Sequence, residues 1–205
     1  TLAVSIHTPK WIIFNSADFK IDHTPAIDRP ADLAKIARIG AEWVKLYIWD
    51  SLGSNKKWRS ISEKEIWENL DELIQKTKTR ILIATFASNV WRIIQIVNSA
   101  IKANKTIFLS GRSMVNNIEI CQQLGYIKVP KWYIRKLNEE VDTFPDDQVL
   151  ILSTGAQGEE FAALTRMSRN EHNFLQLRKW DTILMSATPI PGNEWSVNTM
   201  INNLI

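Results

Sequence analysis

Residues 182–194 read Thr-Ile-Leu-Met-Ser-Ala-Thr-Pro-Ile-Pro-Gly-Asn-Glu, an apolar strand-like run followed by a polar loop with two prolines and one glycine. In open parallel sheets ligands bind outside the carboxyl ends of the strands, so such a loop predicts a binding surface. The same design occurs three times upstream, in residues 80–89, 106–113 and 149–159. We therefore expect four buried strands that present four polar loops at one edge of a sheet.

The chain between these strands carries helical spacing, and this alternation predicts a parallel sheet with helices on both faces. The expected elements are strands 80–86, 105–110, 149–153 and 182–187 and helices 89–103, 113–124 and 158–168. Upstream we expect a hairpin of strands 2–8 and 12–16, a helix over 31–39 closed by Gly40, and a strand over 44–49. A turn-rich segment, residues 51–57, predicts a domain boundary after Asp50, and a helix begins at Ser62 as N-cap and runs to about Lys78.

The four loops, in this order and spacing, resemble the β-CASP domain of the ribonuclease J family, a branch of the metallo-β-lactamase superfamily of nucleases. The resemblance continues upstream in residues 6–9, 16–20, 23–25 and 28–33, which are similar to the late part of that family's first β-lactamase lobe. It implies an α/β fold with a partial metallo-β-lactamase αββα lobe over residues 1–50. A β-CASP domain with a mostly parallel, doubly wound sheet would occupy residues 51–205.

Composition restricts the class of protein only mildly. The 205 residues carry a net charge of +3 and a pI near 9.0, which is compatible with a polyanionic partner such as RNA. Cys121 is the only cysteine, so an intramolecular disulfide and a cysteine-built zinc site are excluded. No apolar run is long enough for a membrane span, and no signal-peptide pattern opens the sequence, so we expect a cytoplasmic protein without a membrane partner.

Two aspartates are candidate catalytic residues. Asp18 lies in a motif similar to the family's Gly-Asp-Phe-Lys, whose aspartate bridges two divalent metal ions, usually zinc, so the resemblance implies that Asp18 is a metal ligand. In this chain Ala17 replaces the glycine. Asp50 matches the family's first acidic motif, which implies that it orients a metal-ligating histidine. From the residues alone, a turn cap is the preferred interpretation of Asp18, and a solvated loop residue is an alternative for Asp50.

The loops also hold candidate RNA-binding residues. Ser88 and Asn89, with Arg92 one turn later, precede a helix whose N-terminus favours phosphate, although ordinary N-capping explains them equally well. Arg112 and Ser113 add a guanidinium and a hydroxyl at the same edge. The loop with Thr154, Gly155, Gln157, Gly158 and Glu159 has the composition to line an RNA channel. The three histidines, His7, His23 and His172, lack metal-ligand spacing and are expected to be structural or exposed.

The resemblance implies that the full-length parent hydrolyses RNA phosphodiester bonds with two metal ions, acts as a 5′-to-3′ exonuclease and an endonuclease, and forms a homo-oligomer. The family's histidine-rich metal motif would precede Thr1 and its remaining histidines would follow Ile205, so this interior fragment alone is expected to be inactive. One alternative is a non-catalytic RNA-binding or assembly module that has lost the metal site. A nucleotide-binding enzyme is disfavoured, because neither a Gly-x-Gly-x-x-Gly motif nor a phosphate-loop lysine follows the first strand of the region 80–187.

Tryptophan and glycine occur in unusual numbers, nine and seven. A chain of this length ordinarily holds about twice as many glycines, at roughly 7%. Several tryptophans, including Trp11, Trp58, Trp132 and Trp180, lie in turn-like sequences, and Trp11 and Trp180 fall where the resemblance suggests glycine. We hypothesise that these codons are UGA and that the source organism reads them as glycine. The alternative is a set of exposed aromatic residues that stack on RNA bases.

Overall fold

The computed structural model describes residues 2–27, 29–55, 57 and 60–205. Trp58 therefore lies outside the described residues. The contacts divide the chain into two compact units, Thr1–Glu68 and Asn69–Ile205, which are described separately below. The expected domain assignment of 1–50 and 51–205 remains a prediction.

The first unit is a three-stranded sheet with one helix between its last two strands. Its elements are β1 (Val4–His7), β2 (Ile12–Asn15), α1 (Leu33–Ala41) and β3 (Val44–Ile48). Strand β1 pairs antiparallel with β2, which confirms the expected hairpin, and β3 pairs parallel with β2. Because β2 and β3 are parallel, the residues that follow Asn15 and Ile48 lie at the same edge of this sheet.

Helix α1 begins and ends two residues later than the expected range of 31–39. The Asp32 side chain accepts a hydrogen bond from the Lys35 backbone N–H at 2.8 Å, an N-cap interaction. The expected closure at Gly40 is wrong, because Gly40 lies inside the helix and Glu42 is the C-cap. The left-handed backbone conformation that ends the helix falls on Trp43, whose φ is +67°.

The start of helix α2 (Glu63–Lys76) is fixed by two side chains. Ser62 Oγ accepts a hydrogen bond from the Lys64 N–H at 3.2 Å, as expected of an N-cap. A carboxylate distant in sequence adds to it, since Asp22 Oδ2 accepts a hydrogen bond from the Glu63 N–H at 2.7 Å. This bond is the main cause that lowers the pKa of Asp22.

The second unit is a five-stranded parallel sheet with the order β6-β5-β7-β4-β8. The strands are β4 (Ile81–Ala84), β5 (Thr106–Ser110), β6 (Ile134–Lys136), β7 (Val149–Ser153) and β8 (Thr182–Met185). The helices that follow are α3 (Val90–Lys102), α4 (Arg112–Gln123), α5 (Ala163–Ser168) and α6 (Glu194–Leu204), with short 3-10 turns η1 (Lys131–Tyr133), η2 (Glu139–Thr143) and η3 (Asp146–Gln148). The predicted fold class, α/β with a mostly parallel sheet, is confirmed.

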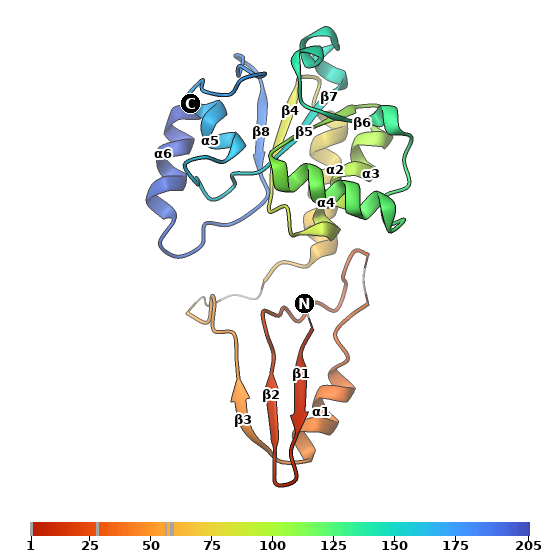
Figure 1. Ribbon diagram of the computed structural model, residues 1–205, viewed down its shortest axis with the longest axis vertical. Coiled ribbons are helices and arrows are strands. Elements are labelled where there is room, and N and C mark those ends of the chain that lie inside the picture. Colours follow the sequence, from red (N-terminus) through yellow and green to blue (C-terminus); the bar gives the residue numbers. More distant parts are fainter. Residues whose placement is uncertain (1, 28, 56, 58–59) are drawn as a thin grey trace. The chain divides into compact units, whose positions relative to one another are not determined.

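Helices cover both faces of this sheet, as Figure 1 shows. On one face Phe108 and Ile151 join a buried core with Leu164 and Met167 of α5 and Met200 of α6. The alternate strand residues, such as Ile107 and Leu150, are also fully buried and face the opposite side, where α4 contacts β5. Burial on both faces explains why these strands are continuous apolar runs in the sequence.

In the second unit, α5, β6 and α6 differ from expectation. Helix α5 begins at Ala163 instead of residue 158, because Gly158 has a φ of +69° and belongs to the preceding loop. Strand β6 and helix α6 were not expected. Strand β6 has three residues of mixed polarity, which is too short for a recognisable period.

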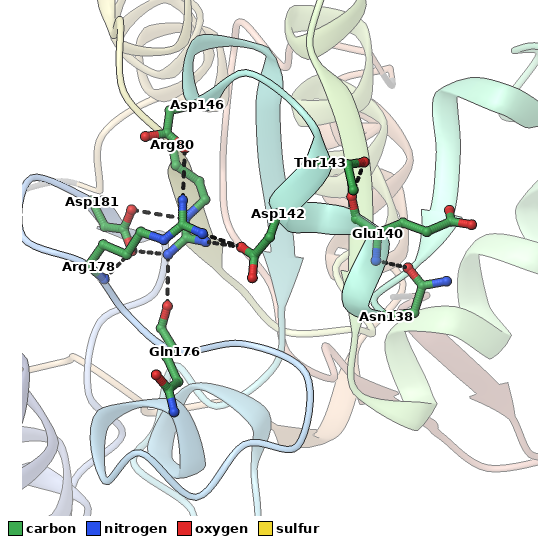
Figure 2. Close-up of polar contacts among 9 residues, drawn as sticks. All are labelled: Arg80, Asn138, Glu140, Asp142, Thr143, Asp146, Gln176, Arg178 and Asp181. Carbon is green, nitrogen blue, oxygen red and sulfur yellow. Dashed lines mark hydrogen bonds and ion pairs between the residues drawn. The ribbon is translucent and has the colours of Figure 1, made fainter.

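The amino end of the strands is held by a buried ion pair, which Figure 2 shows. Arg80 precedes β4 and Asp181 precedes β8, and their side chains are only 2% and 7% exposed. The guanidinium donates to both carboxylate oxygens, at 2.9 and 2.6 Å, and to the Gln176 carbonyl at 2.9 Å. Arg80 thus connects two neighbouring strands at the edge opposite the polar loops.

Candidate functional site: a polar cavity at the carboxyl edge of the parallel sheet

The four loops that the sequence singled out do lie at one edge of the second unit's sheet. Strands β4, β5, β7 and β8 are parallel, so their carboxyl ends point the same way. Strand β5 leads into α4 and its neighbour β7 leads into α5, on opposite faces of the sheet (Figure 1). Such a divergence between neighbouring strands leaves a crevice, where ligands of open α/β sheets bind.

A cavity of about 720 Å³ opens at this crevice. Four of the expected RNA-binding residues line it, together with an asparagine, an arginine and a histidine that the sequence analysis did not select for this role. The seven polar lining residues are Arg112, Ser113, Asn116, Thr154, Glu159, Arg166 and His172. Side chains from three separate segments therefore converge on one polar surface.

Arg112 is the residue of this cavity best placed to meet an anion. It is the first residue of α4 and is exposed, and its guanidinium makes no hydrogen bond or ion pair within the described part of the chain. The guanidinium of Arg166 is partly engaged in hydrogen bonds within the protein, because its Nη2 donates to the Glu171 carbonyl at 2.9 Å and to Asn173 Oδ1 at 3.1 Å. A free guanidinium can donate two parallel hydrogen bonds to a phosphate.

His172 is half-buried and hydrogen-bonded. The sequence analysis expected the histidines to be either structural or exposed, and His172 is structural. Its Nε2 lies 3.0 Å from Ser110 Oγ, and its Nδ1 accepts from the Phe174 backbone N–H at 3.4 Å. Burial lowers the pKa of His172, and the nearby Arg166 lowers it further. A neutral ring that accepts at Nδ1 carries its proton on Nε2, which then donates to Ser110.

The side chain of Gln157 is buried within the protein and does not line the cavity. Its side chain is 2% exposed. The amide Nε2 donates to the Thr188 carbonyl at 2.9 Å, and Oε1 accepts from the Ile190 N–H at 2.7 Å. These two bonds fix the loop after β8 to the loop after β7, which favours a positioning role over direct contact with RNA.

The two glycines of the β7 loop allow close backbone contacts. A Cβ on Gly158 would lie 2.6 Å from the backbone carbon of Ser196 in α6. A Cβ on Gly155, whose φ is +105°, would lie 3.1 Å from the backbone nitrogen of Leu164. Glycine at these positions therefore serves the packing of the loop against α5 and α6.

At the start of α3 lie three further candidate residues, Ser88, Asn89 and Arg92. They are at the same edge of the sheet but do not line the cavity. Asn89 is the N-cap, and its Oδ1 accepts from the Arg92 N–H at 3.2 Å, so the capping alternative describes its side chain. Arg92 is 6% exposed, and its Nη1 donates to Ser186 Oγ at 2.5 Å after β8. Ser88 remains exposed.

In the first unit, the two candidate catalytic aspartates follow neighbouring parallel strands. Asp18 comes three residues after β2 and Asp50 two residues after β3. Ser16 links the two segments, since its N–H donates to the Ile48 carbonyl at 3.0 Å and its Oγ accepts from the Asp50 N–H at 3.3 Å. Asp50 Oδ1 also accepts from the Leu52 N–H at 2.9 Å.

The carboxylate of Asp18 has the chemistry of a metal ligand. Asp18 is exposed, and its carboxylate has no hydrogen bond or ion pair within the described ranges, so both oxygens are available to cations. The described residues contain no group of three or more His, Cys, Asp or Glu able to hold a metal ion.

The same residues contain no helix long and apolar enough to cross a bilayer.

Comparison with known proteins identifies the family to which this chain belongs. Residues 78–204 match the family model "Ribonuclease J, beta-CASP domain". The match covers more than half of the chain and includes the whole parallel sheet. The chain therefore belongs to the ribonuclease J family.

Individual relatives extend the similarity over almost the whole chain. Ribonuclease J of Helicobacter pylori is 40% identical over 203 residues, which are 99% of this chain and 29% of the relative. Ribonuclease J of Corynebacterium glutamicum is 38% identical over 203 residues, 99% of this chain and 28% of the relative. Ribonuclease J of Thermus thermophilus is 40% identical over 201 residues, which are 98% of this chain and 35% of the relative. The chain thus spans about a third of the length of these curated relatives.

Proposed function

We propose that this chain is part of a ribonuclease J-like enzyme that hydrolyses RNA phosphodiester bonds, both 5′-to-3′ and internally, in RNA maturation and decay. Family membership supports the activity, and the cavity with the free Arg112 guanidinium carries the assignment of the second unit to RNA binding. The parent would be a cytoplasmic homo-oligomer, as the family resemblance implies.

Within this proposal the first unit contributes to a centre of two divalent metal ions, zinc by resemblance. When bound, such ions supply a hydroxide near neutral pH and neutralise charge on the phosphate. Asp18 would hold the ions with its two free oxygens. Asp50, whose backbone and side chain are already hydrogen-bonded, would orient another ligand.

The catalytic part of the proposal is tested with the full-length coding sequence and a 5′-monophosphorylated single-stranded RNA. We expect hydrolysis by the unmodified protein, and its loss in Asp18→Asn with RNA affinity retained, because the amide keeps the shape but loses the charge. Asp32→Asn is the matched control, since asparagine caps a helix as well as aspartate does. Turnover of Asp18→Asn near that of the control would remove Asp18 from the centre.

The same assay distinguishes the alternative, a non-catalytic RNA-binding or assembly module. A full-length protein that binds RNA but fails to cleave it with zinc, manganese or magnesium supplied would favour that alternative.

The RNA-binding part is tested by the salt dependence of affinity. Each phosphate neutralised on a single strand contributes about 0.7 to the slope of log K against log salt. Arg112→Ala in the parent is expected to weaken binding and to reduce the slope by about this amount. Arg178→Ala is the control, because Arg178 lies at the opposite edge and pairs with Asp142 and Asp146. Equal slopes for the two variants would remove Arg112 from the RNA surface.

A further inference from the structure

Two tryptophans occupy backbone conformations that large side chains rarely adopt. The φ angles of Trp43 and Trp180 are +67° and +79°. A positive φ places Cβ against the neighbouring carbonyl oxygen, so it is common for glycine, tolerated by asparagine, and an outlier for a bulky residue.

The position of Trp43 can be compared with three equivalent positions in the same chain. Helices α1, α3, α4 and α5 have C-caps at Glu42, Ala103, Leu124 and Arg169. The residue after each C-cap has a positive φ, and these four residues are Trp43, Asn104, Gly125 and Asn170. Glycine and asparagine are the residues that normally fill this position. Trp43 is therefore the single exception among four helix ends of the same geometry.

Trp180 lies in a tight turn with the same requirement. The Asp181 N–H donates to the Arg178 carbonyl at 3.1 Å, which closes a four-residue turn next to the ion pair in Figure 2. Trp180 is the third residue of this turn. A positive φ at the third position selects glycine or asparagine.

The tryptophans of the described residues are exposed, apart from Trp67, which is half-buried. Tryptophan is on average a highly buried residue, yet none of those within the described ranges is buried. Trp43, Trp180 and Trp195 are 80%, 76% and 78% exposed.

Stacking on RNA does not explain this exposure. Trp132 and Trp180 precede β6 and β8 and lie at the amino edge of the sheet. Trp91 and Trp195 lie in helices α3 and α6, which follow β4 and β8 at the carboxyl edge. A base-stacking surface would need its aromatic residues along one path.

We infer that glycine occupies positions 43 and 180 in the protein as its source organism makes it, and that UGA codons decoded there as glycine underlie all nine tryptophans of the printed sequence. One reassigned codon accounts both for the excess of tryptophan and for the shortage of glycine. With all nine positions counted as glycine, the content becomes sixteen of 205 residues, about 8%, close to the usual value of roughly 7%.

Two measurements test the inference directly. The gene is expected to carry UGA at all nine positions, and peptides of the protein isolated from its source organism are expected to contain glycine at positions 43 and 180 by mass spectrometry. A UGG codon at any of the nine positions, or tryptophan at position 43 or 180 in the isolated peptides, would overturn it.

A stability measurement on the 205-residue chain tests the conformational argument. Trp43→Gly and Trp180→Gly are each expected to raise the unfolding temperature by about 2–8 °C, because the strain at positive φ is removed. Trp195→Gly is the matched control, since Trp195 is equally exposed but lies in the first turn of α6, where glycine gives no gain. Unchanged or lowered unfolding temperatures for both test variants would contradict the argument.

Discussion

The ion pair between Arg80 and Asp181 offers a quantitative test of how this fold is held together. Both side chains are almost completely buried, and the carboxylate accepts two hydrogen bonds from the guanidinium (Figure 2). The exposed Asp142 is a weaker partner of Arg80, at 3.4 Å. Asp181→Asn keeps the shape of the side chain and removes its charge, so Arg80 would remain as a buried cation with only this distant counter-charge.

The magnitude follows from what an uncompensated buried charge costs. Removing one partner of a buried pair typically destabilises a protein by about 3–5 kcal/mol. We expect the low end, about 3 kcal/mol, because the asparagine Oδ1 still accepts one hydrogen bond and Gln176 still accepts another. For a chain of this size 1 kcal/mol shifts the unfolding temperature by about 2–4 °C, so the expected decrease is about 6–12 °C.

Urea unfolding followed by circular dichroism measures this change, and Glu72→Gln is the control. Glu72 forms an exposed pair with Lys76 one turn away on α2, and such pairs contribute only about 0.2–1 kcal/mol. Replacing Arg80 by methionine in the Asp181→Asn background removes the unpaired charge and should recover part of the loss. A loss below about 1 kcal/mol for Asp181→Asn, equal to that of the control, would refute the role assigned to this pair.

Three further predictions concern single side chains. Gln157→Leu should cost about 1–3 kcal/mol because two hydrogen bonds of this buried side chain, to the Thr188 carbonyl and from the Ile190 N–H, are lost at about 0.5–1.5 kcal/mol each; a fall in RNA affinity of the parent without a loss of stability would instead indicate direct RNA contact. Because the folded-state pKa of His172 lies below about 6.5, the unfolded chain binds more protons, so the free energy of unfolding should fall as the pH drops below this value; His172→Gln should abolish that dependence, and an unchanged slope would contradict the assignment. Ala17→Gly should stabilise the chain by about 1 kcal/mol in urea unfolding, since Ala17 has a φ of +49°; a destabilised variant would show that this conformation is not strained.

Strands β4, β5 and β7 were predictable because they are buried on both faces and read as apolar runs, as in Val149–Ser153. The start of α5 could not be predicted from the sequence, because residues 158–162 have a helix-compatible composition. Only the packing of Gly158 against Ser196 excludes them from the helix. Asn89 illustrates an ambiguity that local sequence leaves open. A phosphate ligand and an N-cap need the same side chain, and the bond from the Arg92 N–H identifies the cap.

The sequence by itself determined the family, the four polar loops at strand ends, and the unusual balance of tryptophan and glycine, since these are properties of residue type, order and spacing. Only the tertiary structure decided that β7 lies between β4 and β5, and with that order which loops share a cavity. The convergence of Arg112 with Arg166 and His172, and the burial of Gln157, depend on that order. The physical reason is that these contacts join residues far apart in the chain, where no local periodicity or turn preference acts.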